Sequence, residues 1–200
     1  MSAISTTIAE ELGKTGLSVY PDFLSNHSVS DVRDDLELIQ NSHGFHRAGT
    51  GQNEGEEIRN KVRRDDVHWL NRNDSNRAQD ILWVKIDSLK QAFNRTLYQG
   101  LSSFEGHYAS YPSGGFYKRH RDSFKSDDSR QISMVLYLNK DWKSQDAGQL
   151  RVYQDNTHTD INPVGGTLVC FMSRESEHEV LTSNAPRQSF TGWFKREQKN

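Results

Sequence analysis

Three side chains in the sequence stand out, by their types and spacing, as candidates to bind a metal ion. His120 and Asp122 stand two positions apart at the end of FYKRHRD, and His178 lies later, in SEHEVLT. Turn residues followed by aromatic residues predict a strand up to His120, and residues two apart on a strand point to one face. Two imidazoles and a carboxylate form the set that holds Fe(II) on one side and leaves coordination positions open. The His-x-Asp pair alone is a weak signal, and binding through such groups is expected to weaken in acid.

Arg187 is a candidate anion-binding residue. It follows the turn SNAP, nine residues after His178, on a strand expected to return beside that of the histidine. A buried guanidinium needs a carboxylate partner, which its planar fork can bind through two hydrogen bonds. The stretch RQSFTGWF contains no acid. A bound carboxylate is therefore one candidate partner, and an acidic residue elsewhere in the chain is the alternative.

Several stretches, taken in order, resemble one enzyme family. They are YPSGGFYKRHRD, MVLYLNKDW, AGQLRVY, HEVLTSNAPR and FTGWF, and the upstream stretch VRRDDVHWL extends the similarity to residues 43–195. Together they resemble the 2-oxoglutarate- and Fe(II)-dependent dioxygenases, most nearly the prolyl hydroxylases of bacteria and those acting on hypoxia-inducible factor. The loop between Tyr111 and His120 looks one residue shorter than in the animal enzymes. Ala147 stands where a glycine is usual.

The resemblance implies roles for individual residues. It implies that the iron ligands are His120, Asp122 and His178. It implies that the residues binding 2-oxoglutarate are Arg187 and Tyr137, on its far carboxylate, with Tyr111, Leu150 and Trp193 lining the pocket. It implies that the residues beside the substrate are Arg63, Asp65 and Trp69.

One more residue joins the substrate group, and several assignments have alternatives. His107 lies four positions before Tyr111 on the same expected strand, hence on the same face, and is predicted to point into the pocket. The aromatic and aliphatic pocket residues can equally be ordinary core. Arg63 and Asp65 can equally form an exposed ion pair, which is common and weak.

The activity implied by the resemblance is protein prolyl 4-hydroxylation. It couples oxidative decarboxylation of 2-oxoglutarate to succinate and CO2 with hydroxylation of a prolyl residue, possibly in a translation factor. Fe(II), 2-oxoglutarate and O2 would be required, with ascorbate as reductant. Asp122 argues against a halogenase, which needs that position vacant for halide.

Two other functions remain open. One is hydroxylation of free proline or another small molecule. The long polar loop at 49–65 argues mildly against it, because prolyl hydroxylases carry such a loop here to fold over a polypeptide. The other is a non-catalytic module that binds 2-oxoglutarate or senses oxygen. The complete metal-binding set together with Arg187 argues against that reading.

Three helices are expected to support the site from the first hundred residues. One covers residues 4–13 and ends at Gly13, and a second is capped at Ser30-Asp31, carries Val32, Leu36 and Ile39, and stops near Gly44. The strongest lies within residues 76–100 and ends near Gly100. Its apolar stripe predicts packing across the outside of a sheet and consists of Leu82, Ile86, Leu89, Phe93 and Leu97.

The second half of the chain reads as short strands. From Phe104 onward they are FEGHYASY, FYKRHRD, QISMVLYL, GQLRVY, THTDI, GTLVCFM, EHEVLT and RQSFTGWF, separated by turn signals. Eight such strands predict an antiparallel jelly roll. The expected fold is thus α+β, a double-stranded β-helix (jelly roll) with N-terminal helices packed on one sheet. We expect one domain over 1–200, with core motifs at about 104–195 and helical support in 1–100.

The composition of the chain bears on its expected binding partners and on its expected location in the cell. The 25 basic and 27 acidic residues give a net charge of −2 and form no basic run, so nucleic acid is not an expected partner. The longest apolar runs are too short to span a membrane. Cys170 is the single cysteine, expected to be buried and compatible with a reducing compartment. The acidic start of the chain is unlike a signal peptide, so a cytoplasmic location is expected.

Overall fold

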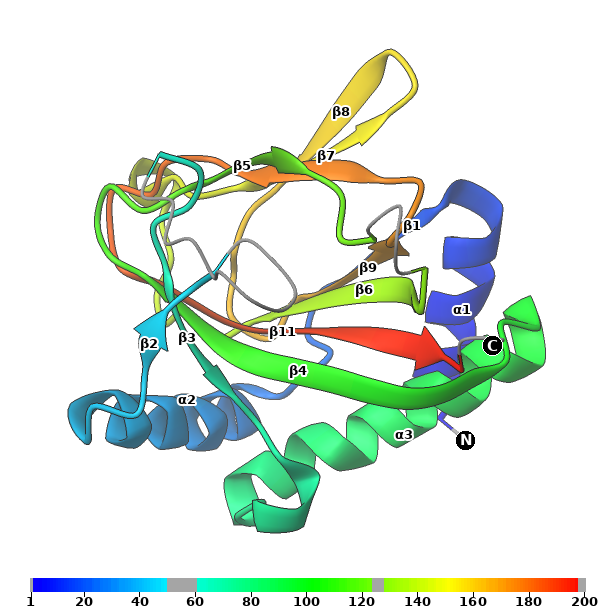
Figure 1. Cartoon of the computed structure of the whole chain (residues 1–200), viewed down its shortest axis with the longest axis horizontal. Coiled ribbons are helices and arrows are strands. Elements are labelled where there is room, and N and C mark those ends of the chain that lie inside the picture. Colours follow the sequence, from blue (N-terminus) through cyan, green and yellow to red (C-terminus); the bar gives the residue numbers. More distant parts are fainter. Residues whose placement is uncertain (1, 50–60, 124–127, 198–200) are drawn as a thin grey trace.

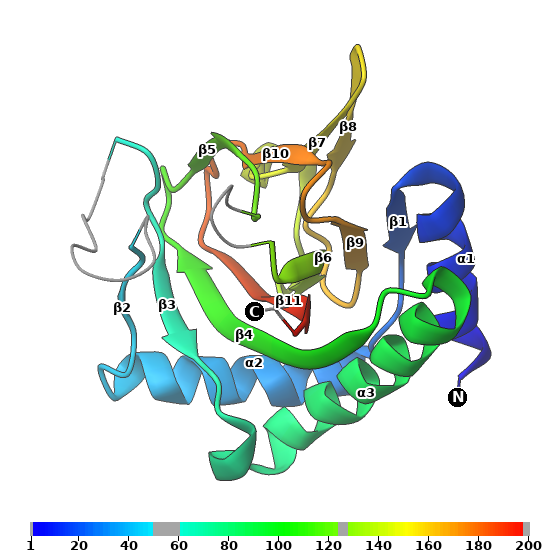
Figure 2. The ribbon, with the colours of Figure 1, turned by 45° about the vertical axis from the view of Figure 1, so that its right-hand side comes forward.

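Two antiparallel sheets form the centre of the computed structural model, which describes residues 2–49, 61–123 and 128–197 (Figure 1). The larger sheet has seven strands, in the spatial order β1 (Leu17–Tyr20), β9 (Leu168–Met172), β6 (Arg130–Tyr137), β11 (Arg187–Arg196), β4 (Leu101–Tyr111), β3 (Asp66–Trp69) and β2 (His46–Arg47). The smaller sheet has four, in the order β5 (Tyr117–His120), β10 (Glu177–Val180), β7 (Leu150–Gln154) and β8 (Thr157–Ile161). The sheets face each other, and the predicted jelly roll with its eight later strands is confirmed (Figure 2).

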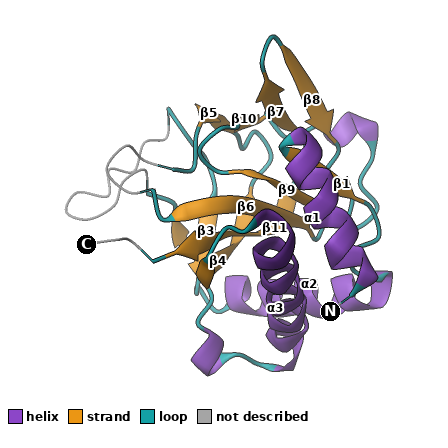
Figure 3. Ribbon diagram, turned by 90° about the vertical axis from the view of Figure 1, so that its right-hand side faces the viewer, coloured by secondary structure: helices purple, strands orange, loops and turns teal. Residues whose placement is uncertain are grey.

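Three helices cover the outer face of the larger sheet: α1 (Ala3–Thr15), α2 (Asn26–Asn41) and α3 (Arg77–Leu97) (Figure 3). The stripe predicted on α3 is confirmed, since Leu82, Ile86, Leu89 and Phe93 are buried in this layer and Leu97 packs beside them. Among the described residues, no helix is both long enough and apolar enough to cross a lipid bilayer.

Alternation along the strands of the larger sheet produces two separate apolar cores. On β6, Met134 and Leu136 face the helices, whereas Val135 and Tyr137 face the smaller sheet. Successive side chains of a strand point to opposite faces, so one strand can serve both cores. Cys170 on β9 is buried as predicted, in the core beneath the helices. The core between the two sheets surrounds the candidate site.

The first helix runs further than the sequence pattern indicated. It continues past Gly13 to Thr15 and ends at Gly16, which adopts a left-handed φ of 73°. A side chain at Gly13 would place its Cβ 2.7 Å from Leu97, so this glycine permits close packing of α1 on α3 instead of ending the helix.

The boundaries of the other two helices also differ from the prediction. Helix α2 begins at Asn26, because the Ser25 side chain accepts a hydrogen bond from the Ser28 amide. The predicted cap at Ser30-Asp31 is therefore wrong and lies inside the helix. Helix α3 ends at Leu97, and the next residue, Tyr98, already adopts a left-handed φ of 54°, ahead of Gly100.

Strands β4 and β11 form the floor of the site. They pair over almost their whole length, with Arg187 opposite Tyr111 and Thr191 opposite His107. Alternate residues of β11 have opposite surroundings: Arg187, Thr191 and Trp193 line the cavity between the sheets, while Phe190 and Phe194 lie in the core beneath the helices.

A buried carboxylate ties this floor to two helices. Asp35 on α2 accepts hydrogen bonds from Asn76 Nδ2 at 2.5 Å, Gln79 Nε2 at 3.0 Å and the Tyr108 hydroxyl at 2.8 Å. Asn76 caps α3 and Tyr108 belongs to β4. Because a buried acceptor is costly to leave unpaired, this cluster favours one placement of α2 and α3 on the sheet.

Candidate active site

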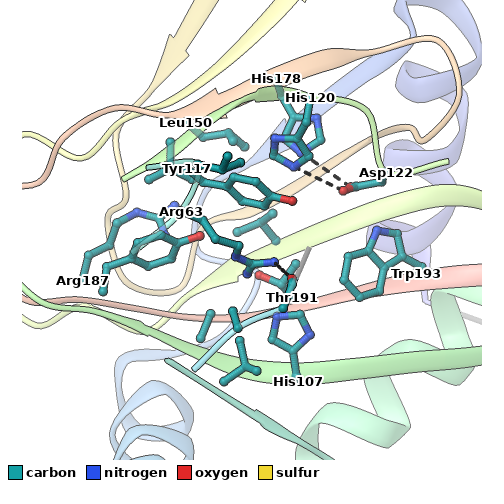
Figure 4. A pocket seen from close by; sticks show the side chains of 18 of the residues that line it. Arg63, His107, Tyr117, His120, Asp122, Leu150, His178, Arg187, Thr191 and Trp193 are labelled. Carbon is teal, nitrogen blue, oxygen red and sulfur yellow. Dashed lines mark hydrogen bonds and ion pairs between the residues drawn. The ribbon is translucent and has the colours of Figure 1, made fainter. Parts of the chain in front are cut away.

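A cavity of about 380 Å³ lies between the two sheets and collects most of the predicted site residues (Figure 4). Ten of them line it: Arg63, Trp69, His107, Tyr111, His120, Asp122, Leu150, His178, Arg187 and Trp193. The other two, Asp65 and Tyr137, are buried just outside the lining, Asp65 bonded to Arg63 and Tyr137 beside Arg187. The structure thus brings the three predicted groups together around one space.

The candidate metal ligands converge at the edge of the smaller sheet. One ligand atom each from His120, Asp122 and His178 lies within 4.8 Å of the others. The two histidines are cross-strand neighbours on β5 and β10, and each Nε2 lies 3.5 Å from an oxygen of Asp122. Asp122 itself follows the end of β5 in a bend. The strand alternation used to place it beside His120 therefore does not apply, and a turn of the chain brings it there.

Backbone contacts of the two histidines leave Nε2 as the ligand atom. His120 Nδ1 lies 2.7 Å from the Lys118 carbonyl, and His178 Nδ1 lies 3.4 Å from the Ser176 carbonyl. A carbonyl oxygen only accepts, so in each neutral ring the proton is assigned to Nδ1. The Nε2 lone pairs are then free and both face Asp122.

The protonation states at this cluster suit a divalent metal ion. Burial lowers the pKa of His178 to about 4, with the Asp122 carboxylate opposing part of that effect. Burial by itself would raise the pKa of Asp122, but His178, His120 and the Ser133 hydroxyl hold it well below its ordinary value. At neutral pH His178 is therefore neutral and Asp122 ionised, as metal binding requires. Two imidazoles and one carboxylate are the donor set of non-haem Fe(II) sites.

The other end of the cavity offers donors to which the described residues supply no acidic partner. Arg187 is 3 % exposed, and its Nε donates to the Gly148 carbonyl at 3.0 Å. Its guanidinium lies 5.0 and 5.1 Å from the ring centres of Tyr111 and Tyr137. Within residues 2–49, 61–123 and 128–197, no carboxylate forms an ion pair with Arg187, and the buried Tyr137 hydroxyl has no hydrogen-bond partner. Unsatisfied buried donors of this kind fit the carboxylate of a ligand such as 2-oxoglutarate.

The predicted Arg63–Asp65 pair is buried, so the alternative of an exposed ion pair is wrong. Asp65 is 1 % exposed and accepts from Arg63 Nε at 2.7 Å and Nη2 at 2.6 Å. Arg63 Nη1 donates to the Gly49 carbonyl at 3.2 Å, and the guanidinium lies 4.2 Å from the Tyr117 ring centre. Most N–H groups of Arg63 thus form hydrogen bonds within the protein, at the base of the predicted loop.

An aromatic group forms the wall opposite the metal cluster. The rings of His107, Trp69 and Trp193 contact one another, and the ring centre of His107 lies 4.7 Å from Trp69 and 5.4 Å from Trp193. Burial, with Arg63 and Arg130 nearby, lowers the pKa of His107 to about 3, so this ring is neutral at physiological pH. Figure 4 shows Trp193 on the side of Asp122, far from Arg187 along β11.

Among the residues around the cavity that were not predicted from the sequence, Tyr117, Arg130 and Ser133 contact predicted site residues. The Tyr117 ring stacks on His120 at 3.6 Å and 18°. Arg130 lies 3.7 Å over the Trp193 ring and binds Glu105 at 2.8 Å. Ser133 bonds to Asp122. Tyr117 lies inside the recognised stretch YPSGGFYKRHRD, which offered a signal, whereas nothing in the sequence marks Arg130 or Ser133.

Most of the loop from Gly49 to Val62, predicted to fold over a polypeptide, lies outside the described residues. The chain on its far side pairs with β5: the Arg64 amide donates to the Phe116 carbonyl, and the Lys118 amide donates to the Val62 carbonyl, both at 2.9 Å. The end of this loop is therefore joined to the strand that carries His120.

Comparisons with known proteins agree with this geometry. The sequence profile of the 2OG-Fe(II) oxygenase superfamily matches residues 106–195. The crystal structure of a Pseudomonas putida prolyl-4-hydroxylase superposes with a TM-score of 0.88 and 35 % identity, covering 97 % of this chain and 100 % of that one. A Trichoplax adhaerens prolyl hydroxylase was solved with a peptide fragment of the hypoxia-inducible factor oxygen degradation domain. It superposes with a TM-score of 0.85 and 29 % identity, covering 96 % of this chain and 89 % of that one.

A curated relative points the same way over part of its length. Human Egl nine homolog 1 is 27 % identical over 191 residues, covering 92 % of this chain and 44 % of the relative. The chain spans about half the length of the Egl nine homologs it matches. The family follows from the match to the Pseudomonas enzyme, which is 35 % identical and is covered over its whole length. The chain belongs to the prolyl hydroxylases of the 2-oxoglutarate- and Fe(II)-dependent oxygenase superfamily.

Proposed function

We propose that this chain is a protein prolyl 4-hydroxylase that depends on Fe(II) and 2-oxoglutarate. It couples decarboxylation of 2-oxoglutarate to succinate and CO2 with hydroxylation of a prolyl residue. One observation carries the proposal: a two-histidine, one-carboxylate cluster and a buried arginine without an acidic partner among the described residues line the same cavity.

The metal and the cosubstrate would occupy different ends of the cavity. His120 and His178, through Nε2, and the Asp122 carboxylate would hold Fe(II). Arg187 and Tyr137 would bind the far carboxylate of 2-oxoglutarate through a charged fork and a hydroxyl. When bound, Fe(II) with 2-oxoglutarate and O2 supplies the oxidising chemistry that places a hydroxyl group on a substrate C–H carbon.

The chain's own residues orient the reactants and shield them from water. Leu150 and the ring of Tyr111 line the cavity, with Tyr111 beside Arg187, where they would exclude water from the cosubstrate. The aromatic wall of Trp69, His107 and Trp193 offers ring faces against which a pyrrolidine ring could pack. Because His107 is neutral, this wall adds no charge.

A polypeptide is the proposed substrate rather than free proline. Trp69 is 44 % exposed at the cavity, where it can meet a chain that continues beyond the prolyl ring. The Trichoplax relative was solved with a peptide fragment. A translation-factor prolyl as target, ascorbate as reductant and a cytoplasmic location belong to the same proposal.

The deciding experiment measures succinate formation from 2-oxoglutarate with Fe(II), with and without candidate proline-containing peptides and free proline. We expect a proline-containing peptide to raise turnover and to gain the mass of one oxygen atom. Stimulation by free proline alone would favour the small-molecule alternative. Binding of 2-oxoglutarate without succinate formation under any condition would favour the non-catalytic module.

A further inference from the structure

Two serine hydroxyls with no assigned role lie behind Asp122. Ser133 belongs to β6 of the larger sheet and Ser173 directly follows β9, and both are 0 % exposed. Ser133 Oγ lies 2.7 Å from Asp122 Oδ2 and 2.8 Å from Ser173 Oγ. These three groups form a short hydrogen-bonded row that runs from the larger sheet to a candidate metal ligand.

Chemistry fixes the direction of the row. An ionised carboxylate can only accept, so the single hydroxyl proton of Ser133 is donated to Asp122. Ser133 then has only lone pairs for Ser173, and Ser173 must be the donor in that contact. Consecutive hydrogen bonds of one direction polarise each other, so the Ser173 contact strengthens the bond from Ser133 to Asp122.

Asp122 needs such support because no strand holds it. It lies in a bend after the last residue of β5, and from the described residues its backbone carbonyl accepts only a long contact, 3.4 Å, from Arg130 Nη1. Ser133, in contrast, is paired on both sides, with Trp193 on β11 and Phe171 on β9. A fixed donor on the larger sheet thus meets a carboxylate whose backbone is irregular.

We propose that Ser133 and Ser173 are positioning residues that orient the Asp122 carboxylate for the metal ion. The inference rests on the proposed function, because it takes Asp122 as a ligand. Partners that hydrogen-bond a metal ligand commonly change metal affinity about 10- to 100-fold when they are removed. Ser133 touches the ligand directly and Ser173 acts only through it, so their effects are unequal.

The test uses Mn(II) without O2, with free Mn(II) followed by electron paramagnetic resonance. Ser133→Ala should weaken Mn(II) binding about tenfold or more, and Ser133→Thr, which keeps a hydroxyl, should restore most of it. Ser173→Ala should have a smaller effect, and adding it to Ser133→Ala should weaken binding no further. The Co(II) absorption spectrum should change in Ser133→Ala, as expected for an altered ligand geometry.

Ser189→Ala provides the matched control. Ser189 is a buried serine on the neighbouring strand β11, and its hydroxyl has no hydrogen-bond partner in the described part of the chain. Its removal should leave Mn(II) affinity unchanged. Wild-type affinity in Ser133→Ala overturns the positioning role, and so does a loss in Ser189→Ala equal to that in Ser133→Ala. If Asp122→Ala also binds Mn(II) like the wild type, the metal assignment fails as well, which separates the two conclusions.

Discussion

The two walls of the cavity are built differently. The larger sheet is backed by three helices, and its floor strands β4 and β11 have eleven and ten residues. The smaller sheet has strands of four or five residues, and its outer side chains form exposed ion pairs such as Arg151–Asp160 and Arg119–Glu177. One wall therefore has a core on both faces, whereas the other has a core on one face only.

The proposed cosubstrate-binding residues and the candidate metal-binding histidines lie on different sheets, and so differ in how they are supported. Arg187 and Tyr137, proposed to bind the cosubstrate, belong to the larger sheet, where packing fixes their positions before any ligand binds. The candidate metal ligands His120 and His178 belong to the smaller sheet. His178 lies on an inner strand, but His120 ends an outer strand and relies on stacking with Tyr117. We infer that the metal site, more than the cosubstrate site, depends on a few individual contacts: the Tyr117 ring beside His120 on β5 and the Ser133 hydroxyl that reaches Asp122 from the larger sheet.

The largest expected effect comes from removing one of the three candidate metal ligands. Asp122→Ala should abolish succinate formation and Mn(II) binding together, because the cluster of His120, Asp122 and His178 loses its carboxylate. Mn(II) titration and a succinate assay measure both. Asp160→Ala removes an acid from the outer face of the smaller sheet and should alter neither. Near-normal activity in Asp122→Ala would contradict the ligand assignment.

The next largest effect concerns the proposed cosubstrate site on the larger sheet. Arg187→Lys loses the bidentate fork but keeps the charge, so the KM for 2-oxoglutarate should rise about tenfold or more, as expected for a charged hydrogen bond of roughly 1.5–3 kcal/mol. Mn(II) affinity should survive. Arg151→Lys, at an exposed arginine that also binds its partner through two nitrogens, is the control. An unchanged KM in Arg187→Lys would remove this residue from the cosubstrate site.

A smaller effect addresses the support of His120. Tyr117→Leu removes the ring stacked at 3.6 Å and should weaken Mn(II) binding several-fold, in line with about 0.5–1.5 kcal/mol for an aromatic pair. Tyr117→Phe keeps the ring and should bind like the wild type. Equal losses in the two variants would mean that the hydroxyl, not the stacking, matters.

The smallest effect at neutral pH concerns His107. Its folded-state pKa of about 3 lies below the ordinary 6.5, so the unfolded chain binds this proton first as the pH falls. Its contribution to stability is present above pH 6.5 and is lost as the pH falls toward about 3, by at most about 1.4 kcal/mol per pH unit. His107→Met should lose less free energy of unfolding than the wild type over this range, measured by urea titration. Parallel curves would contradict the buried neutral ring.

The sequence predicted what depends on local pattern and recognisable spacing. The later strands and the stripe on α3 were found from local pattern, and most residues of the group around His120 and Arg187 were found through the resemblance to a family. Contacts across strands were not predictable, because Ser133 and Asp122, or Tyr117 and Arg63, meet only after the sheets have formed. The start of α2 was missed because Ser25 and Ser30 are equally good caps by type.

The alternation of β11 has a consequence for how this chain can change in length. Arg187 and Trp193 line the cavity, while Phe190 and Phe194 fill the core beneath the helices. Inserting or deleting one residue between Arg187 and Trp193 would shift the register by one and exchange the two faces downstream, carrying an indole under the helices and a phenyl ring into the cavity. The turn between β7 and β8, at the tip of a projecting hairpin, is free of that constraint (Figure 2). Insertions and deletions should therefore accumulate at that tip and be absent from β11, even where its individual side chains vary.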